Sequence, residues 1–188
     1  QPPPPPPPGR PRSAAAAMVG MRTEQRLEVG PPIDWSFKEL SSLEETLSTE
    51  PNSGVPKGSA SGSLPSGTMA NSNSLRVSNN DIGTLEKLVE VAEATLDDPS
   101  QLAWLDASHC GLTSVEPVLL RFPQLKVLYL HGNNITKLSE VTKLGQLANL
   151  QKLTLHGNPM EELPNYRLHV LTTIPKLRSL DFSAVTKL

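Results

Sequence analysis

Apolar and polar residues alternate with the same spacing in two stretches of this chain. Residues 125–135 read LKVLYLHGNNI, and residues 150–160 read LQKLTLHGNPM. In both stretches an aliphatic residue or methionine occupies the first, fourth, sixth and eleventh places, and Asn occupies the ninth. A period of two over the middle of each stretch indicates a short strand with one buried side. Two copies 25 residues apart predict a repeated unit whose strands lie side by side.

This spacing resembles the consensus of leucine-rich repeats, L-x-x-L-x-L-x-x-N/C-x-L. Three other stretches fit it: a degenerate first repeat at 75–82, a second at 102–112, and a truncated last repeat at 177–182, in which Phe182 should point into the core. Helical spacing of apolar residues between repeats predicts helices or 3-10 turns. The expected fold class is therefore α/β, a right-handed solenoid with a short parallel sheet on its concave side and helices on its convex side.

The strand period sends the third, fifth and seventh places of each repeat to the face opposite the core, the concave face. We expect a protein partner to bind there, because Trp104 and Tyr129 form an aromatic pair on neighbouring strands, as binding hot spots often do. The predicted partner-binding residues are Trp104, Asp106, Ser108, Val127, Tyr129, His131, Lys152, Thr154, His156, Ser179 and Asp181.

Two histidines and one cysteine are the other candidates for chemistry. His131 and His156 hold the same place in neighbouring repeats, so their rings should stack. They could share a metal with Asp106, but no third good donor is evident, and we expect neither metal nor cofactor. A pH-sensitive contact is the preferred alternative. Cys110 takes the ninth place of the second repeat, which predicts a buried structural residue rather than a nucleophile.

Four regions follow from composition. Residues 1–30 form a proline- and alanine-rich leader, expected to be disordered, whose proline run is either low-complexity sequence or a ligand for a proline-recognising domain. Residues 31–50 hold Ile33, Trp35 and Phe37, which either dock on the solenoid edge or form a linear motif for a partner. Residues 51–73 read as a disordered linker, and residues 74–188 as the repeat domain with its C-terminal cap.

Charge and motifs narrow the class of function. The net charge of −2 gives no general attraction to nucleic acids or acidic membranes. The single cysteine excludes an internal disulfide and suggests a reducing compartment. No apolar run reaches the roughly 18 residues of a membrane span. Phosphate-binding loops, zinc-protease motifs and nucleophile elbows are absent from the sequence, so we expect a non-catalytic monomer that binds protein.

Three blocks resemble the leucine-rich repeat-containing protein 51 family: PPIDWSF at 31–37, LAWLDASHCGLTSVEPVL at 102–119, and LHGNPMEE at 155–162 followed by DFSAVTK at 181–187. The resemblance implies a cytoplasmic scaffold or adaptor without catalytic activity, capped by a helix over 166–173. It also suggests a role in ciliary or axonemal assembly. The alternative is a regulatory subunit that holds an enzyme such as a phosphatase.

Overall fold

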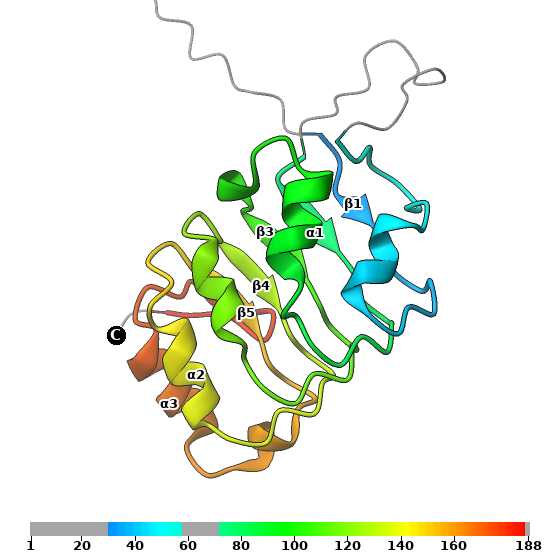
Figure 1. Cartoon of the computed structure of the whole chain (residues 1–188). Helices are drawn as coiled ribbons and strands as arrows, with labels where there is room; N and C mark the ends of the chain where they lie inside the picture. The colour runs from blue at the N-terminus through cyan, green and yellow to red at the C-terminus, as the bar shows by residue number, and fades with distance from the viewer. Residues whose placement is uncertain (1–29, 58–71, 187–188) are drawn as a thin grey trace, which may run out of the picture.

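The computed structural model describes residues 30–57 and 72–186, in which seven strands form a single sheet in chain order (Figure 1). The first six strands run parallel, and the last turns back antiparallel to its neighbour. The predicted repeat architecture is thereby confirmed. The strands are β1 (Ile33–Asp34), β2 (Ser74–Arg76), β3 (Trp104–Asp106), β4 (Val127–Tyr129), β5 (Lys152–Thr154), β6 (Ser179–Leu180) and β7 (Ser183–Ala184).

The fourth-place residues of successive repeats pair directly across the sheet. Leu105 lies opposite Leu128, and Leu128 opposite Leu153, with exposures of 1% or less. Because the strand period is two, this register aligns the leucine side chains on one face, where they build a continuous core. Each repeat alone exposes its leucines, so the core exists only when the repeats stack.

The strands are joined by short helices that lie on one side of the sheet (Figure 1). Three of the 3-10 helices begin at a proline, whose fixed φ suits the first helical position and whose missing N–H has no partner to lose there. The helices are η2 (Leu43–Leu47), α1 (Leu88–Thr95), η3 (Pro99–Gln101), η4 (Pro117–Arg121), α2 (Ser139–Leu144), η5 (Pro159–Glu162) and α3 (Tyr166–Thr173).

In three of the turns, a buried carboxamide at the ninth place ties the turn to the preceding coil. Asn133 donates through Nδ2 to the carbonyls of Ala107 and Leu130, both at 2.9 Å. Its Oδ1 accepts from the amides of Cys110 and Leu112 at 2.9 and 3.1 Å. A single side chain therefore satisfies four buried backbone groups that have no strand partner. We call this series the asparagine ladder; its members are Asn80, Asn133 and Asn158, with Cys110 holding the ninth place between the first two.

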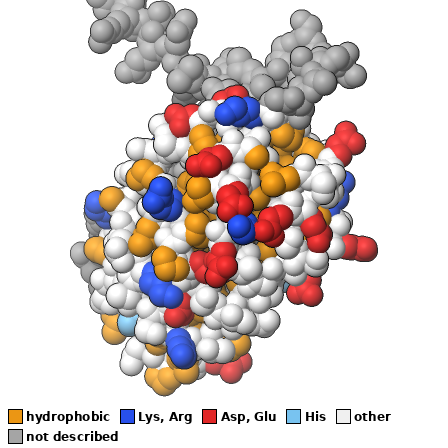
Figure 2. All heavy atoms as spheres, in the orientation of Figure 1, with side chains coloured by type: hydrophobic (Ala, Val, Ile, Leu, Met, Phe, Trp, Pro, Cys, Tyr) orange, Lys and Arg blue, Asp and Glu red, His pale blue; other side chains and the backbone are white. Residues whose placement is uncertain are grey.

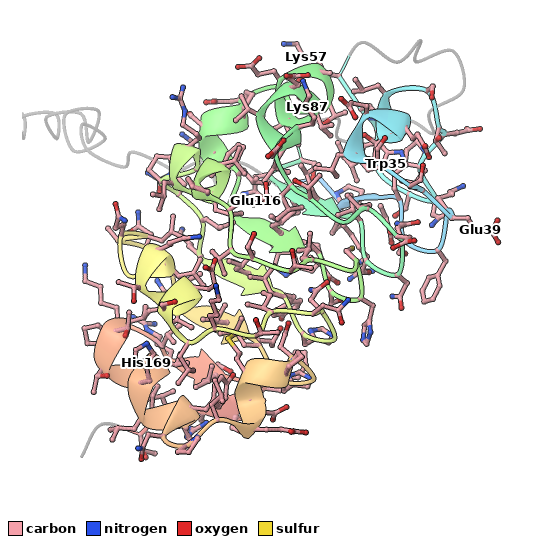
Figure 3. All side chains as sticks on the ribbon, turned by 60° about the horizontal axis from the view of Figure 1, so that its bottom comes forward. Trp35, Glu39, Lys57, Lys87, Glu116 and His169 are labelled. Carbon is pink, nitrogen blue, oxygen red and sulfur yellow. The ribbon has the colours of Figure 1, made fainter. Side chains whose placement is uncertain are left out.

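Residues 31–50 dock on the N-terminal edge of the solenoid. Strand β1 pairs with β2, and Ile33 and Trp35 are buried in the common core. The Trp35 indole donates to the carbonyl of Thr49 at 2.8 Å, which holds η2 over the ring; Figure 3 shows Trp35 beside this helix, with Glu39 at the periphery. Phe37 remains 74% exposed, so the docked segment covers the edge of β2 with two of its three apolar anchors.

The boundaries of the expected linker differ from those in the structure. The backbone amide of Asn52 donates to the carbonyl of Asp34 at 2.6 Å. The backbone amide of Asp34 in turn donates to the carbonyl of Ser53 at 3.0 Å. The amide of Lys57 donates to the carbonyl of Thr95 at 2.8 Å. Residues 51–57 are thus hydrogen-bonded to the solenoid, because backbone pairing does not require apolar side chains. The rest of the expected linker, 58–71, and residues 1–29 of the leader lie outside the described residues.

Helix α3 closes the C-terminal end of the core. Tyr166, Val170, Ile174 and Leu177 are buried there and cover the leucines of the last repeats. The expectation that Phe182 points into the core is wrong: its side chain is 62% exposed, because the chain reverses at 181–182 into β7. None of the helices in the described ranges combines the length and apolarity that crossing a bilayer requires.

The asparagine ladder gives a test of the fold. We expect Asn133→Ala to lower the free energy of unfolding by about 3 kcal/mol or more, because it leaves four buried backbone groups without their hydrogen-bond partner. Urea denaturation followed by circular dichroism measures this loss. The matched control is Asn134→Ala, whose exposed side chain should contribute within about 0.5 kcal/mol. Equal effects of the two substitutions would contradict the role assigned to the ladder.

Candidate functional site

The structure brings the predicted residues together on the concave face, as the third, fifth and seventh places of adjacent repeats. Trp104 pairs with Val127 and then Lys152 along one row. Asp106 pairs with Tyr129 and then Thr154 along the next. Their exposure is uneven. Lys152 is exposed, and seven residues are half-buried: Trp104, Val127, Tyr129, His131, His156, Ser179 and Asp181.

Three of the predicted residues are buried, which corrects the expectation that their side chains face a partner. Asp106 accepts from the amide and the hydroxyl of Ser108 at 3.1 and 2.6 Å. The hydroxyl of Thr154 lies 2.9 Å from Nδ1 of His131. Thr154 as a whole is only 1% exposed. These short polar side chains are covered by larger neighbours on the same face, so they orient the surface and do not form it.

Five rings form a continuous cluster on this face, which we call the aromatic patch: Trp104, Tyr129, His131, His156 and Phe182. Trp104 meets Tyr129 edge-on, with centroids 5.8 Å apart. His131 and His156 stack with centroids 4.7 Å apart and planes 6° apart, as their shared place in the repeat predicts. Each ring restricts its neighbours, so the patch presents an ordered apolar surface.

Phe182 completes the patch, and the sequence alone assigned it to the core. Its ring lies 5.4 Å from Tyr129, 5.7 Å from His131 and 5.6 Å from His156. It therefore contacts the ring of Tyr129 in β4 and the two imidazoles that follow β4 and β5. No sequence signal distinguishes this position from an ordinary sixth place; only the reversal of the chain after β6 turns it outward.

The turn that carries Phe182 is conformationally demanding. Asp181 and Phe182 have φ of 52° and 60°, as a two-residue type I′ hairpin requires. Such turns favour Asn-Gly or Asp-Gly, and a bulky residue in the left-handed region costs roughly 1 kcal/mol or more. Phe182 therefore lowers the stability of the turn while it places an aromatic ring on the concave face.

Asp181 anchors that hairpin and is not a free acidic group. Its Oδ1 accepts from the amides of Leu155 and His156 at 2.7 and 3.0 Å. Its Oδ2 accepts from the Tyr166 hydroxyl at 2.8 Å, which joins the cap helix to the last strand. Burial and this carboxylate raise the pKa of Tyr166, so the phenol remains a donor. Although predicted to contact a partner, Asp181 has its carboxylate oxygens occupied within the fold.

A charged cluster beside Trp104 was missed by sequence reasoning. Arg76 lies 3.2 Å from Asp34 and 3.4 Å from Asp106, which joins three adjacent strands. Its guanidinium also sits 5.1 Å from the centroid of the Trp104 ring. Counting places in the degenerate first repeat would have found Arg76 at the fifth place. Asp34 had no such signal, because its segment lacks the consensus.

A further histidine, His109, lies next to His131 and occupies the eighth place of its repeat. Asn79, His109, Gly132 and Gly157 all occupy it with φ between 52° and 71°. His109 tolerates that conformation, and its exposed ring meets His131 edge-on at 5.3 Å. A Cβ on Gly132 would come within 2.2 Å of the His109 ring, so Gly132 provides the space that the imidazole occupies.

The surroundings of His131 lower its pKa. Burial lowers the pKa of His131 first, and the neighbouring His156 lowers it further. Asp106 and Asp181 oppose this effect, and His109 adds to it. The neutral imidazole is therefore favoured at neutral pH, with Thr154 as its hydrogen-bond partner.

Cys110 lies in the core below the concave face. Cys110 is fully buried, and burial raises the pKa of its thiol to about 12, so it remains protonated. The prediction of a buried ladder residue is confirmed; Sγ lies 3.2 Å from the carbonyl of Val77. Within the described ranges, His, Cys, Asp and Glu side chains form no group of three that could hold a metal ion.

Comparison with known proteins gives a consistent family. Residues 108–188 match the family described as "Leucine-rich repeat". The chain is 45% identical over 157 residues to leucine-rich repeat-containing protein 51 of Macaca mulatta and of Homo sapiens, matches that cover 84% of this chain and 80% of each relative. The crystal structure of the Drosophila melanogaster SNF/U2A′ complex is similar with a TM-score of 0.51 and 27% identity, and the match covers 60% of this chain and 61% of that chain.

The strained turn can be tested through stability alone. We expect Phe182→Gly to be more stable than Phe182→Ala by about 1 kcal/mol, because glycine adopts the left-handed conformation without penalty. Both variants lose the ring, so the comparison isolates the backbone. Thermal and urea unfolding of the two proteins measures the difference. Equal stabilities would show that the turn is not strained.

The titration of His131 gives a second test. Its NMR midpoint should lie below the ordinary value of 6.5, and His156→Gln should raise the pKa without restoring it fully, because burial is the larger cause. Lys137→Gln, a distant charge change, is the control. A lowered folded pKa means that the unfolded chain binds more protons in this window. Stability from His131 is therefore complete above about pH 6.5 and is lost as the pH falls through the folded pKa. A native midpoint at or above 6.5 would contradict this.

Proposed function

Because this chain belongs to the leucine-rich repeat-containing protein 51 family, we propose that it is a non-catalytic scaffold that binds a protein partner through the aromatic patch. The family supports a protein-interaction role in general. The observation that supports this particular surface is the set of five contacting rings on the concave face, with Phe182 left 62% exposed at a strained turn.

The chemistry of the patch favours a protein ligand. Aromatic rings in mutual contact offer a large contact area with little side-chain freedom left to lose on binding. Asp34, Arg76 and Lys152 lie at its borders and provide polar contacts around an apolar centre, the usual composition of an interface. The similar solved structure is that of a complex, SNF/U2A′ of Drosophila melanogaster, which is consistent with a binding role for this fold.

Two finer parts of the hypothesis stay predictions. A position in the cytoplasm and a role in ciliary or axonemal assembly follow only from the family resemblance. Neither changes the physical argument for the binding surface, which rests on the geometry of the patch.

Site-specific photocrosslinking in cells tests the proposed surface. Phe182 and Leu168 are both 62% exposed, so replacing each in turn with p-benzoyl-phenylalanine compares two equally accessible sites. We expect a discrete crosslinked protein from position 182 and none of that mass from position 168 on α3. Mass spectrometry identifies the product. Adding Tyr129→Ala should reduce its yield by about tenfold or more, as truncation of a hot spot would.

The result is checked against folding. Each variant should keep its melting transition within a few degrees of the parent protein, since the replaced side chains are not part of the buried core. Identical crosslinking from the two positions, or a yield that does not respond to Tyr129→Ala, would exclude the concave face as the partner-binding surface.

A further inference from the structure

Charge is distributed unequally along the solenoid. Residues 30–57 and 72–101 contain eleven acidic and four basic side chains, whereas residues 121–186 contain eight basic and four acidic ones. In Figure 2 red side chains gather over the region of α1 and η2, and blue side chains are spread over the region of α2. The small net charge therefore hides two oppositely charged halves.

The basic residues of the second half concentrate where the chain enters the last three parallel strands. The second-place residues Lys126, Gln151 and Arg178 are consecutive across the sheet. The carbonyl of Lys126 accepts from the amide of Gln151 at 2.9 Å, and the carbonyl of Gln151 accepts from the amide of Arg178 at 2.7 Å. The backbones of Lys126 and Arg178 thus lie roughly 10 Å apart, which is two strand spacings.

We call this strip the basic edge, and it carries no acidic side chain. Segments 121–127, 145–153 and 174–180 contain no Asp or Glu. Among the described residues, none of the cations of the strip lies within 4 Å of a carboxylate. The members of the basic edge are Arg121, Lys126, Lys152, Lys176 and Arg178, all exposed.

A depression of about 330 Å³ lies at the C-terminal end of the basic edge. The residues that line it include Asn149, Gln151, Lys176 and Arg178. The Lys176 ammonium donates to the carbonyl of Ala148 at 3.2 Å, which fixes it at the rim and leaves its other protons open. Within the described residues the Arg178 guanidinium has no hydrogen-bond partner, so its paired N–H groups are available to an oxyanion.

We propose that the basic edge binds a short acidic segment of a protein partner, with one carboxylate seated between Lys176 and Arg178. Guanidinium and ammonium groups beside a carboxamide suit a carboxylate, and Lys126 and Lys152 meet further acidic residues along the strip. The basic edge adjoins the aromatic patch only at Lys152, and the proposal does not depend on the patch being a binding site.

The length of the strip and its surroundings favour a peptide over a nucleic acid. The cations cover only about three repeats, and the acidic half of the solenoid begins at Asp97 and Asp98, on the approach to the preceding strand β3. A long polyanion would extend over this acidic half and be repelled. A segment of a few acidic residues avoids it.

Fluorescence anisotropy with the full chain tests the proposal. The probe is a labelled glycine- and serine-flanked peptide with six consecutive glutamates, compared with the same peptide carrying glutamines. At low salt, where screening is weak, we expect the glutamate peptide alone to bind. Lys176→Gln with Arg178→Gln should weaken its affinity about tenfold, the loss of two charge-assisted contacts.

Matched variants separate a site from general attraction. Lys137→Gln with Arg167→Gln removes the same charge from exposed positions outside the strip and should change the affinity less than about twofold. Tyr129→Ala should also leave it unchanged, which keeps this test independent of the aromatic patch. Melting curves confirm that each variant is folded.

Four results would overturn the proposal. The two peptides could bind alike, both double variants could weaken binding equally, or Tyr129→Ala could weaken it as much as the loss of Lys176 and Arg178. Tighter binding of an oligouridylate of equal charge, lost in the same double variant, would assign the basic edge to nucleic acid instead.

Discussion

Three turns of this solenoid depend on a buried carboxamide, that of Asn80, Asn133 or Asn158, which hydrogen-bonds to two neighbouring coils. Strands of two or three residues supply few backbone hydrogen bonds, and the chain that leaves them turns inside a dry core. Asn133 satisfies groups of its own coil and of the preceding one, and Asn158 reaches back to Leu130 in the same way. Asn80 donates to Trp35 and accepts from Lys38 and Leu40. The same device that joins the repeats therefore attaches residues 31–50, although that segment does not read as a repeat.

The geometry of the concave face follows from this constraint. Once the ninth place is fixed, the eighth place must take a positive φ, and the seventh place lies beside the strand on the open face. Two histidines at the seventh place must then stack about one strand spacing apart, as His131 and His156 do at 4.7 Å. The aromatic patch is thus a consequence of register, and its rings are held by the same alignment that packs the leucines below them.

The sequence could predict the features that follow from the register of the repeats, and it could not predict the others. The consensus places predicted the leucine core, the buried Cys110, the Trp104–Tyr129 pair and the stacked histidines, because each depends only on period and register. Period cannot show which polar side chains of the concave face are covered by larger neighbours, so the burial of Asp106, Ser108 and Thr154 was missed. Nor can it show where the repeat stops. The reversal at 181–182 depends on hydrogen bonds that Asp181 accepts from Leu155 and Tyr166, which are distant in the sequence. The backbone hydrogen bonds of residues 51–57 were missed because the composition of this segment is typical of a linker.

The position of Phe182 connects stability with the proposed binding. A phenylalanine at a left-handed position lowers the stability of its hairpin, and the ring recovers little by burial because it stays mostly exposed. The turn persists because Asp181 accepts hydrogen bonds from Leu155, His156 and Tyr166, which fix the backbone whatever residue follows. With the backbone held, the ring is confined by Tyr129, His131 and His156, so little of its rotamer freedom remains to be lost. A partner that covers the aromatic patch would therefore meet rings already ordered by the fold, which lowers the entropic cost of association.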